Sequence, residues 1–165
     1  MANDEWQTPQ DLFDKLNEEF DFDMDIASNS LNKKCGLYIS KEENALESDW
    51  INYIKQSLLY NHSLVQYCVY LNPPYSRGNI DKFCQKAYEE SQKGCTVVGL
   101  LPLRSASWFH KYVMKAHEIR FLTRRVKFID PETGKPSKGS PNFDSIIVVW
   151  KPGHVDAPKV SSYEW

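Results

Sequence analysis

The sequence predicts an α/β protein whose sheet is mostly parallel and ends in an antiparallel hairpin. Apolar runs of strand length alternate with amphipathic segments at helical spacing, which is the pattern of a doubly wound sheet. Residues 95–101 form a continuous apolar run, as expected for a central strand buried on both faces. The last two apolar runs, residues 118–122 and 144–150, have a turn-rich loop between them, which predicts the hairpin. At 165 residues, the chain is most simply one domain spanning residues 1–165.

The first predicted elements are a helix and a short strand. Thr8 suits the N-cap of the helix, and Pro9 suits its first helical position. The apolar stripe that follows at helical spacing consists of Leu12, Phe13, Leu16 and Phe20. Residues 20–27 then alternate between apolar and acidic side chains, which predicts a strand with one buried face.

The middle of the chain continues the alternation of helices and strands. Residues 51–64 and 79–93 have apolar side chains at helical spacing, and residues 65–70 between them form a strand-like run. Residues 107–116 are again helix-like. The tail from Lys151 has little pattern, so we expect it to lie on the surface.

Composition narrows the class of protein. No apolar run approaches the roughly 18 residues that a membrane-spanning helix needs, so no membrane segment is expected. The first residues are polar and acidic, unlike a signal peptide, and predict a cytoplasmic protein. The four cysteines form no C-x-x-C pair and the four histidines are scattered, so we expect reduced, buried thiols and no metal site.

Charge is distributed unevenly along the chain, although the net charge is only −2. Residues 1–50 carry 4 basic and 13 acidic side chains, whereas residues 51–165 carry 16 basic and 9 acidic ones. Such asymmetry can create a polarised surface with one side that attracts phosphates. A mixed, solvated surface is the alternative, since halves of a sequence need not be halves of a molecule.

The most informative segment, Asn72-Pro73-Pro74-Tyr75, lies between the strand-like run and the helix-like segment 79–93. Two prolines cannot continue a helix or a ladder, so the polar side chains are presented where the strand ends. Because neither proline has an N–H, the Asn72 side-chain oxygen and the Pro73 carbonyl form a pair of acceptors suited to an amino group. Tyr75 adds a flat ring on which a planar base could stack. The alternative is a rigid turn capped by a packing tyrosine.

Asn72-Pro73-Pro74-Tyr75 resembles the catalytic motif of amino-methyltransferases that use S-adenosylmethionine. Together with Trp6-Gln7-Thr8-Pro9 and Asp25-Ile26-Ala27-Ser28, in that order, it resembles the small phage DNA N6-adenine methyltransferases of the Dam type. The resemblance covers Glu5 to Trp150. It implies a Rossmann-like methyltransferase fold and direct methyl transfer, without a metal, to the N6 amino group of an adenine in DNA. The adenine would leave the base stack to react.

The resemblance also implies a set of residues that bind S-adenosylmethionine. They are Trp6, Thr8, Pro9, Asp25, Ala27, Ser28, Asn44 and Asp49. The sequence departs from the commoner methyltransferase pattern, because no glycine lies between Met1 and Cys35 to form a glycine-rich turn. Other roles are open for these residues: a helix start at Thr8, a surface strand at Asp25, and helix caps or loop positions at Asn44 and Asp49.

DNA is the expected partner, and basic or polar residues late in the chain are the candidates for contacting it. They are Ser76, Arg77, Arg104, Arg124, Arg125, Lys127, Lys135 and Lys138. The chain has no room for a separate target-recognition domain. We therefore expect relaxed or short sequence specificity, or reading of the sequence by residues 130–142 and their neighbours.

Two alternatives follow from the same residues. The motif also resembles enzymes that methylate amino groups of RNA or the glutamine amide of proteins, although the late basic residues disfavour a protein substrate. A catalytically inactive nucleic-acid-binding protein or acidic decoy is the second alternative, suggested by the acidic first 50 residues.

Overall fold

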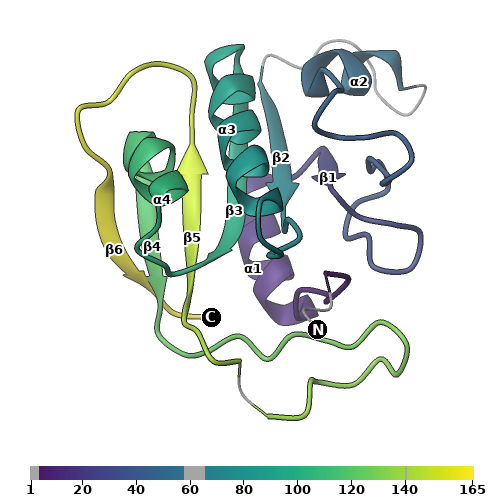
Figure 1. The fold of residues 1–165 in the computed structure, drawn as a ribbon. Coiled ribbons are helices and arrows are strands. Elements are labelled where there is room, and N and C mark those ends of the chain that lie inside the picture. Colours follow the sequence, from purple (N-terminus) through teal and green to yellow (C-terminus); the bar gives the residue numbers. More distant parts are fainter. Residues whose placement is uncertain (1–3, 58–65, 140) are drawn as a thin grey trace.

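The computed structural model describes residues 4–57, 66–139 and 141–165, and its centre is a six-stranded sheet (Figure 1). The strand order is β1-β2-β3-β5-β4-β6. The strands are β1 (Met24–Ile26), β2 (Tyr67–Leu71), β3 (Cys95–Pro102), β4 (Glu118–Leu122), β5 (Ser145–Trp150) and β6 (Lys159–Tyr163). The predicted α/β class is confirmed.

The sheet is partly antiparallel. β1, β2 and β3 pair in parallel, and so do β4 and β6. β5 lies between β3 and β4 and is antiparallel to both. The predicted antiparallel pairing of residues 118–122 with 144–150 is confirmed as β4 and β5, whereas the mostly parallel sheet is not, because β5 is antiparallel to both of its neighbours. The pair does not end the sheet, since β6 forms the edge beyond β4. β6 comes from the tail in which the sequence shows little pattern, and most of its residues are exposed, as expected for the surface.

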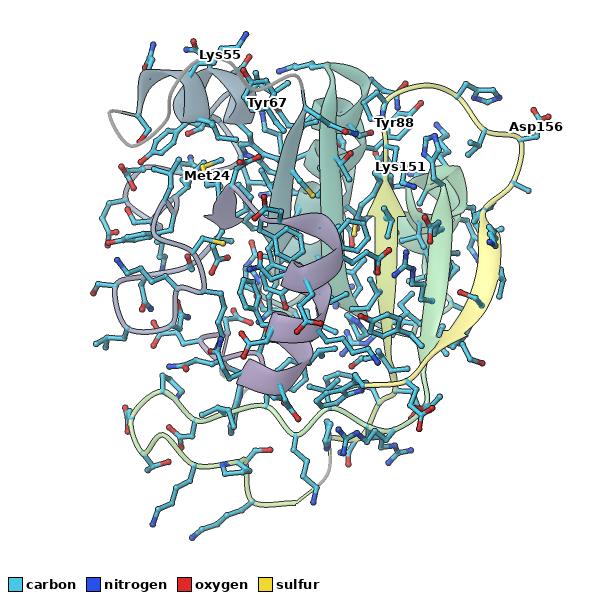
Figure 2. All side chains as sticks on the ribbon, turned by 180° about the vertical axis from the view of Figure 1, so that it is seen from behind. Met24, Lys55, Tyr67, Tyr88, Lys151 and Asp156 are labelled. Carbon is cyan, nitrogen blue, oxygen red and sulfur yellow. The ribbon has the colours of Figure 1, made fainter. Side chains whose placement is uncertain are left out.

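Helices cover both faces of the sheet. α3 (Asn79–Gln92) and α4 (Ser107–Lys111) lie over one face (Figure 1), and α1 (Gln10–Phe20) lies over the other (Figure 2). α2 (Trp50–Gln56) packs near β1 and β2. The predicted helix 107–116 is interrupted, since α4 is followed by the 3-10 helix η1 (Val113–Lys115). Most of the predicted helix 51–64 beyond α2 lies outside the described residues.

The N-terminal elements differ from the sequence prediction in their bounds. α1 begins at Gln10, with Pro9 as its N-cap residue and no side-chain cap, so Thr8 is not the cap. The Thr8 hydroxyl instead bonds to the Tyr70 hydroxyl at 2.6 Å, a contact between residues far apart in the sequence. β1 contains only Met24–Ile26, and all three residues are buried. The strand is therefore shorter than the alternation over residues 20–27 predicts. The surface position left open for Asp25 is also wrong, since this residue is only 3% exposed.

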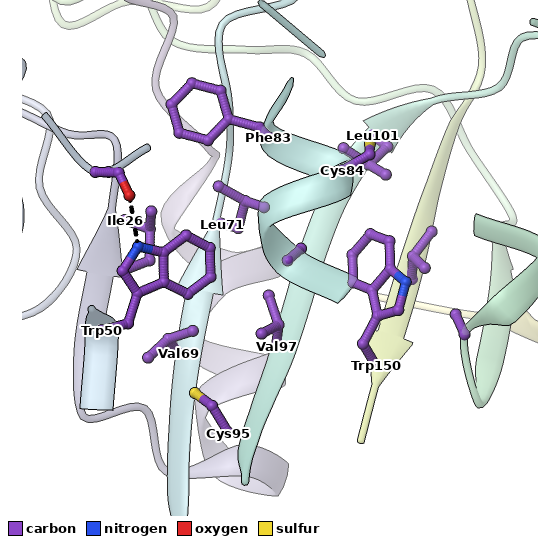
Figure 3. Close-up of a cluster of buried hydrophobic side chains, with 14 of the residues drawn as sticks. Ile26, Trp50, Val69, Leu71, Phe83, Cys84, Cys95, Val97, Leu101 and Trp150 are labelled. Atoms are coloured by element: carbon purple, nitrogen blue, oxygen red, sulfur yellow. Dashed lines mark hydrogen bonds between the residues drawn. The ribbon is translucent and has the colours of Figure 1, made fainter. Parts of the chain in front are cut away.

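The larger core lies between the sheet and the α3 and α4 layer. Figure 3 shows Trp50 and Trp150 on this face, with Val69 and Val97 of adjacent strands between them. Both indoles are fully buried. The Trp50 indole N–H donates to the Ala45 carbonyl oxygen at 2.8 Å, drawn as a dashed line in Figure 3. Buried polar groups that are satisfied in this way do not weaken a core.

A second core lies between α1 and the opposite face of the sheet. Leu12, Phe13 and Leu16 of α1 pack there on Tyr70 and Val98. Because helices cover both faces of the sheet, a ligand can reach polar side chains only near the ends of the strands. Among the described residues, no helix has the length and apolar character needed to cross a lipid bilayer.

Candidate active site

The Asn72–Tyr75 segment lies at the carboxyl end of β2, as predicted. β1 runs parallel to β2, so Ala27 and Ser28, which follow β1, lie at the same end of the sheet as Asn72. The N-terminal segment and the long loop between β4 and β5 also reach this end (Figure 1). Ligands of open α/β sheets bind at the carboxyl ends of parallel strands.

Three adjoining cavities open at this end of the sheet. The large cavity, of about 650 Å³, is lined by Asn72, Pro73 and Tyr75. The small cavity, of about 260 Å³, is lined by Ala27, Ser28 and other residues that follow β1. A narrow space of about 10 Å³ lies between them and shares lining residues with each. The arrangement therefore offers two adjacent ligand positions.

Aromatic rings form much of the large cavity. The rings of Phe128 and Phe143 stand edge-on to that of Tyr75, with centroids 6.0 Å and 5.8 Å away. The Arg104 guanidinium lies 5.6 Å from the centroid of the Phe143 ring, and Arg104 also lines the cavity. Flat rings together with a cation suit a planar, hydrogen-bonding ligand with an anionic group nearby.

The Asn72 side chain is held by hydrogen bonds at both ends of its amide. Its Nδ2 donates to the Trp6 carbonyl oxygen at 3.1 Å, and its Oδ1 accepts from the Tyr75 hydroxyl at 3.2 Å. The single hydrogen of the Tyr75 hydroxyl is shared with the Leu100 carbonyl oxygen, which is the nearer acceptor at 2.7 Å. Burial raises the pKa of Tyr75 well above its usual value, so this hydroxyl stays protonated and acts as a donor.

The small cavity is bounded by residues with uncommon backbone conformations. Ala27 and Asn44 have positive φ angles of 61° and 53°. Asn44 uses its side-chain oxygen to accept from the Leu46 N–H at 3.3 Å. Ser28 also lines this cavity, and its buried hydroxyl lies close enough to the Asp25 carboxylate to lower that group's pKa, against the larger effect of burial.

Asp25 lines the narrow space, and its side chain is almost fully buried. The Lys34 backbone N–H donates to Asp25 Oδ2 at 2.7 Å. Burial nevertheless dominates and raises the pKa of Asp25 from 3.8 to about 7. A carboxyl group with such a pKa, at a ligand cavity, is characteristic of functional sites.

This raised pKa should make stability depend on pH. The unfolded chain releases the Asp25 proton near pH 3.8 and the folded protein near pH 7, so the folded state binds more protons between these values. We therefore expect the free energy of unfolding to fall as pH rises from about 4 to about 7, and this contribution to be lost in Asp25→Asn. Urea unfolding of both proteins across this range measures it. A difference between them that does not vary with pH would contradict the assignment.

The other predicted cofactor residues divide into two groups. Trp6 and Thr8 line the narrow space with Asp25 and Ala27. Pro9 and Asp49 do not line these cavities. Asp49 caps α2 by accepting from the Asn52 N–H at 2.9 Å, and it pairs with Lys93 at 3.5 Å. The helix-cap role that the sequence left open for Asp49 is therefore the one that the geometry supports.

The predicted DNA-contacting residues are also divided. Arg104 and Lys138 line the large cavity. Arg124 lies over the Trp165 ring and donates to its carbonyl oxygen, while Arg125 pairs with Asp144 at 2.9 Å. The backbone N–H of Ser76 donates to Asp4 at 3.1 Å. The remaining members are exposed at the surface: Arg77, Lys127 and Lys135.

Several residues of the site escaped the sequence analysis. Phe128 and Phe143 form the aromatic wall, Asn142 lines the large cavity, and Asp4 lines all three cavities. An isolated aromatic residue directly after a polar, turn-rich loop was the one signal for Phe143. Across residues 4–57, 66–139 and 141–165, no group of three or more His, Cys, Asp or Glu side chains could hold a metal ion.

A polar loop between two adjoining cavities, at the carboxyl ends of parallel strands, defines an α/β enzyme that brings two ligands together. The sequence identifies the family. The profile described as DNA N-6-adenine-methyltransferase (Dam) matches residues 1–163. The chain belongs to the Dam family of DNA N-6-adenine-methyltransferases.

Two phage proteins named DNA N-6-adenine-methyltransferase are similar to the chain. That of Escherichia phage T1 is 30% identical in an alignment of 167 positions that covers 91% of this chain and 63% of the phage protein. That of Haemophilus phage HP1 is 32% identical in an alignment of 165 positions that covers 97% of this chain and 86% of the phage protein. The chain thus spans under two thirds of the T1 protein. No solved structure shows a significant match.

Proposed function

We propose that this chain transfers a methyl group from S-adenosylmethionine to the N6 amino group of adenine in DNA. The observation that carries the proposal is that Asn72 and Pro73, whose side-chain and backbone oxygens could form an acceptor pair, line the large cavity beside a second cavity. The family and the printed names of the phage relatives agree with it. We further propose that β1, β2 and β3, with their crossover helices, are the Rossmann-like half that binds the cofactor.

When bound, S-adenosylmethionine supplies a methyl group on a positively charged sulfur. The small cavity fits a ligand with polar groups, since Ser28 and Asn44 line it and the neighbouring Ala27 is small. Asp25 and Trp6 line the narrow space together with Asn72. Asp25 in its ionised form would hold the cofactor's ammonium group by charge.

On the target side, the chain would hold and orient a base that has left the duplex. Asn72 Oδ1 and the Pro73 carbonyl would accept the two hydrogens of the amino group, which would leave the nitrogen lone pair free to attack the methyl group. Tyr75, Phe128 and Phe143 form an aromatic wall for the ring of the base. Catalysis by these residues is positioning, which converts an encounter of two ligands into an oriented reaction.

Contacts to the DNA backbone would come from the cations nearest the large cavity. Arg104 and Lys138 line that cavity, and exposed Lys135 belongs to the same loop as Lys138. Such contacts position the duplex and carry little sequence information. Specificity would then be short or relaxed, and depend on the loop of residues 130–142. We further propose that the chain acts in the cytoplasm of a bacterial host, as expected if it is phage-encoded like the relatives of phages T1 and HP1.

The proposal is tested by offering the protein tritiated S-adenosylmethionine with DNA, RNA or a protein extract in parallel reactions. The expected result is label in DNA that is lost in Asn72→Ala and Tyr75→Ala. Label in RNA or protein instead would assign another methyl acceptor. Bound cofactor without transfer to any of the three would indicate an inactive binding protein and contradict the proposal.

A further inference from the structure

Asp4 lies where the cavities meet. Among the described residues, it is the one that lines the large cavity, the small cavity and the narrow space between them. Its Oδ1 accepts the Ser76 backbone N–H at 3.1 Å. Asp4 therefore connects the N-terminal segment to the loop that carries Asn72.

A second contact of the N-terminal segment, from the Trp6 carbonyl oxygen, fixes the orientation of the Asn72 amide. The Trp6 carbonyl oxygen can only accept a hydrogen bond, so it selects the orientation in which Asn72 Nδ2 faces it at 3.1 Å. The reversed amide would place two oxygen acceptors against each other. With Nδ2 directed to Trp6, Oδ1 is the end available to an amino group in the large cavity.

Tyr75 leaves that oxygen available. Its hydroxyl has one hydrogen and two acceptors, the Leu100 carbonyl at 2.7 Å and Asn72 Oδ1 at 3.2 Å. The shorter contact takes most of the hydrogen bond, because these interactions weaken with distance. Asn72 Oδ1 is consequently only weakly engaged by the protein itself.

The N-terminal segment that holds Trp6 is anchored on either side of it. After Trp6, Gln7 and Ile129 exchange two backbone hydrogen bonds, each 2.9 Å long. Before Trp6, Asp4 provides the bond to Ser76. The Asn32 Nδ2 also donates to the Glu5 carbonyl oxygen at 3.4 Å, but the Asp4 contact is the one that joins this part of the segment directly to the loop of Asn72 and Ser76.

We propose that Asp4 is a positioning residue for methyl transfer. By accepting the Ser76 N–H, it holds the N-terminal segment where the Trp6 carbonyl orients the Asn72 amide. The inference rests on the proposed function of Asn72 and adds to it a second residue, from the N-terminal segment. Asp4 acts by accepting a hydrogen bond, so the side-chain amide oxygen of an asparagine at position 4 can replace the carboxylate.

This assignment is tested with Asp4→Ala and Asp4→Asn in the full chain. kcat and the KM values for S-adenosylmethionine and DNA are measured separately, along with thermal unfolding. Asp4→Ala should lower kcat about tenfold or more, with each KM changed less than about threefold, because a misplaced acceptor harms the reaction more than binding. Asp4→Asn should retain most of the wild-type kcat. Glu42→Ala removes an exposed acidic residue that does not line the cavities and should match the wild type.

Three results would overturn the assignment. A wild-type kcat in Asp4→Ala would show that the bond to Ser76 is not needed. Equal losses in Asp4→Ala and Asp4→Asn would assign the effect to charge. A raised KM for S-adenosylmethionine with unchanged kcat would make Asp4 a binding contact. Failure of the proposed function is distinct, because it would appear as no methyl transfer to DNA by the wild-type protein, before any Asp4 variant is compared with it.

Discussion

Asn72→Ala is expected to lower kcat about 10²–10³-fold, the usual loss when one preorganised hydrogen-bond partner of a reacting group is removed. The substitution deletes the amide that bridges Trp6 and Tyr75, and with it one of the two acceptors proposed for the amino group. The Pro73 carbonyl would remain, so some activity should persist. Steady-state and single-turnover methyl transfer, each measured at saturating cofactor, give the loss directly.

Asn72→Asp is the matched control for the Asn72 prediction. A carboxylate keeps an acceptor at the Oδ1 position but has no hydrogen to give the Trp6 carbonyl, so it should be less impaired than Asn72→Ala and more impaired than the wild type. Asn72 is only partly buried, and both variants should unfold at close to the wild-type temperature. Full activity in a correctly folded Asn72→Ala variant would show that Asn72 has no role in the reaction.

Trp150→Ala is expected to reduce the free energy of unfolding by about 3–5 kcal/mol, as for other large-to-small changes in a closed core. Trp150 is fully buried on β5, the strand that joins β3 to β4. Its indole N–H donates to the Tyr112 carbonyl oxygen at 2.9 Å, so the change also removes one of the two hydrogen bonds that this oxygen accepts, the other coming from the Lys115 backbone N–H. The room for rearrangement is small, because a Cβ placed on Gly99 would already lie 3.2 Å from the indole.

Chemical denaturation of Trp150→Ala measures this loss, with Trp165→Ala as its control. Trp165 is partly exposed and lies beneath the Arg124 guanidinium, 4.2 Å from the ring centroid, so its removal should cost clearly less. A loss below about 1 kcal/mol in Trp150→Ala, which is the size of an average substitution, would be incompatible with the described core.

Much of the site could be predicted because its signals are local. The apolar run before Asn72 and the two prolines after it are enough to place a polar loop at the end of a strand. The apolar runs of β3 and β5 are likewise explained by strands buried on both faces. These inferences need no knowledge of which segments meet in space.

The predictions that failed depend on contacts between distant residues. Thr8 is a suitable helix cap by type, but its hydroxyl bonds to Tyr70, 62 residues away. β6 is recognisable only through its pairing with β4, because its own residues lack an apolar pattern. The aromatic wall of Phe128 and Phe143 is assembled in the same non-local way.

The identity of the methylated atom tests the central claim most directly. Duplex DNA is incubated with the protein and S-adenosylmethionine, digested to nucleosides and analysed by mass spectrometry against standards. The acceptor pair, the aromatic wall and the family predict N6-methyldeoxyadenosine, formed by the wild type and almost absent with Asn72→Ala. Methylation of the cytosine amino group instead, or N6-methyldeoxyadenosine formed equally by Asn72→Ala, would contradict it.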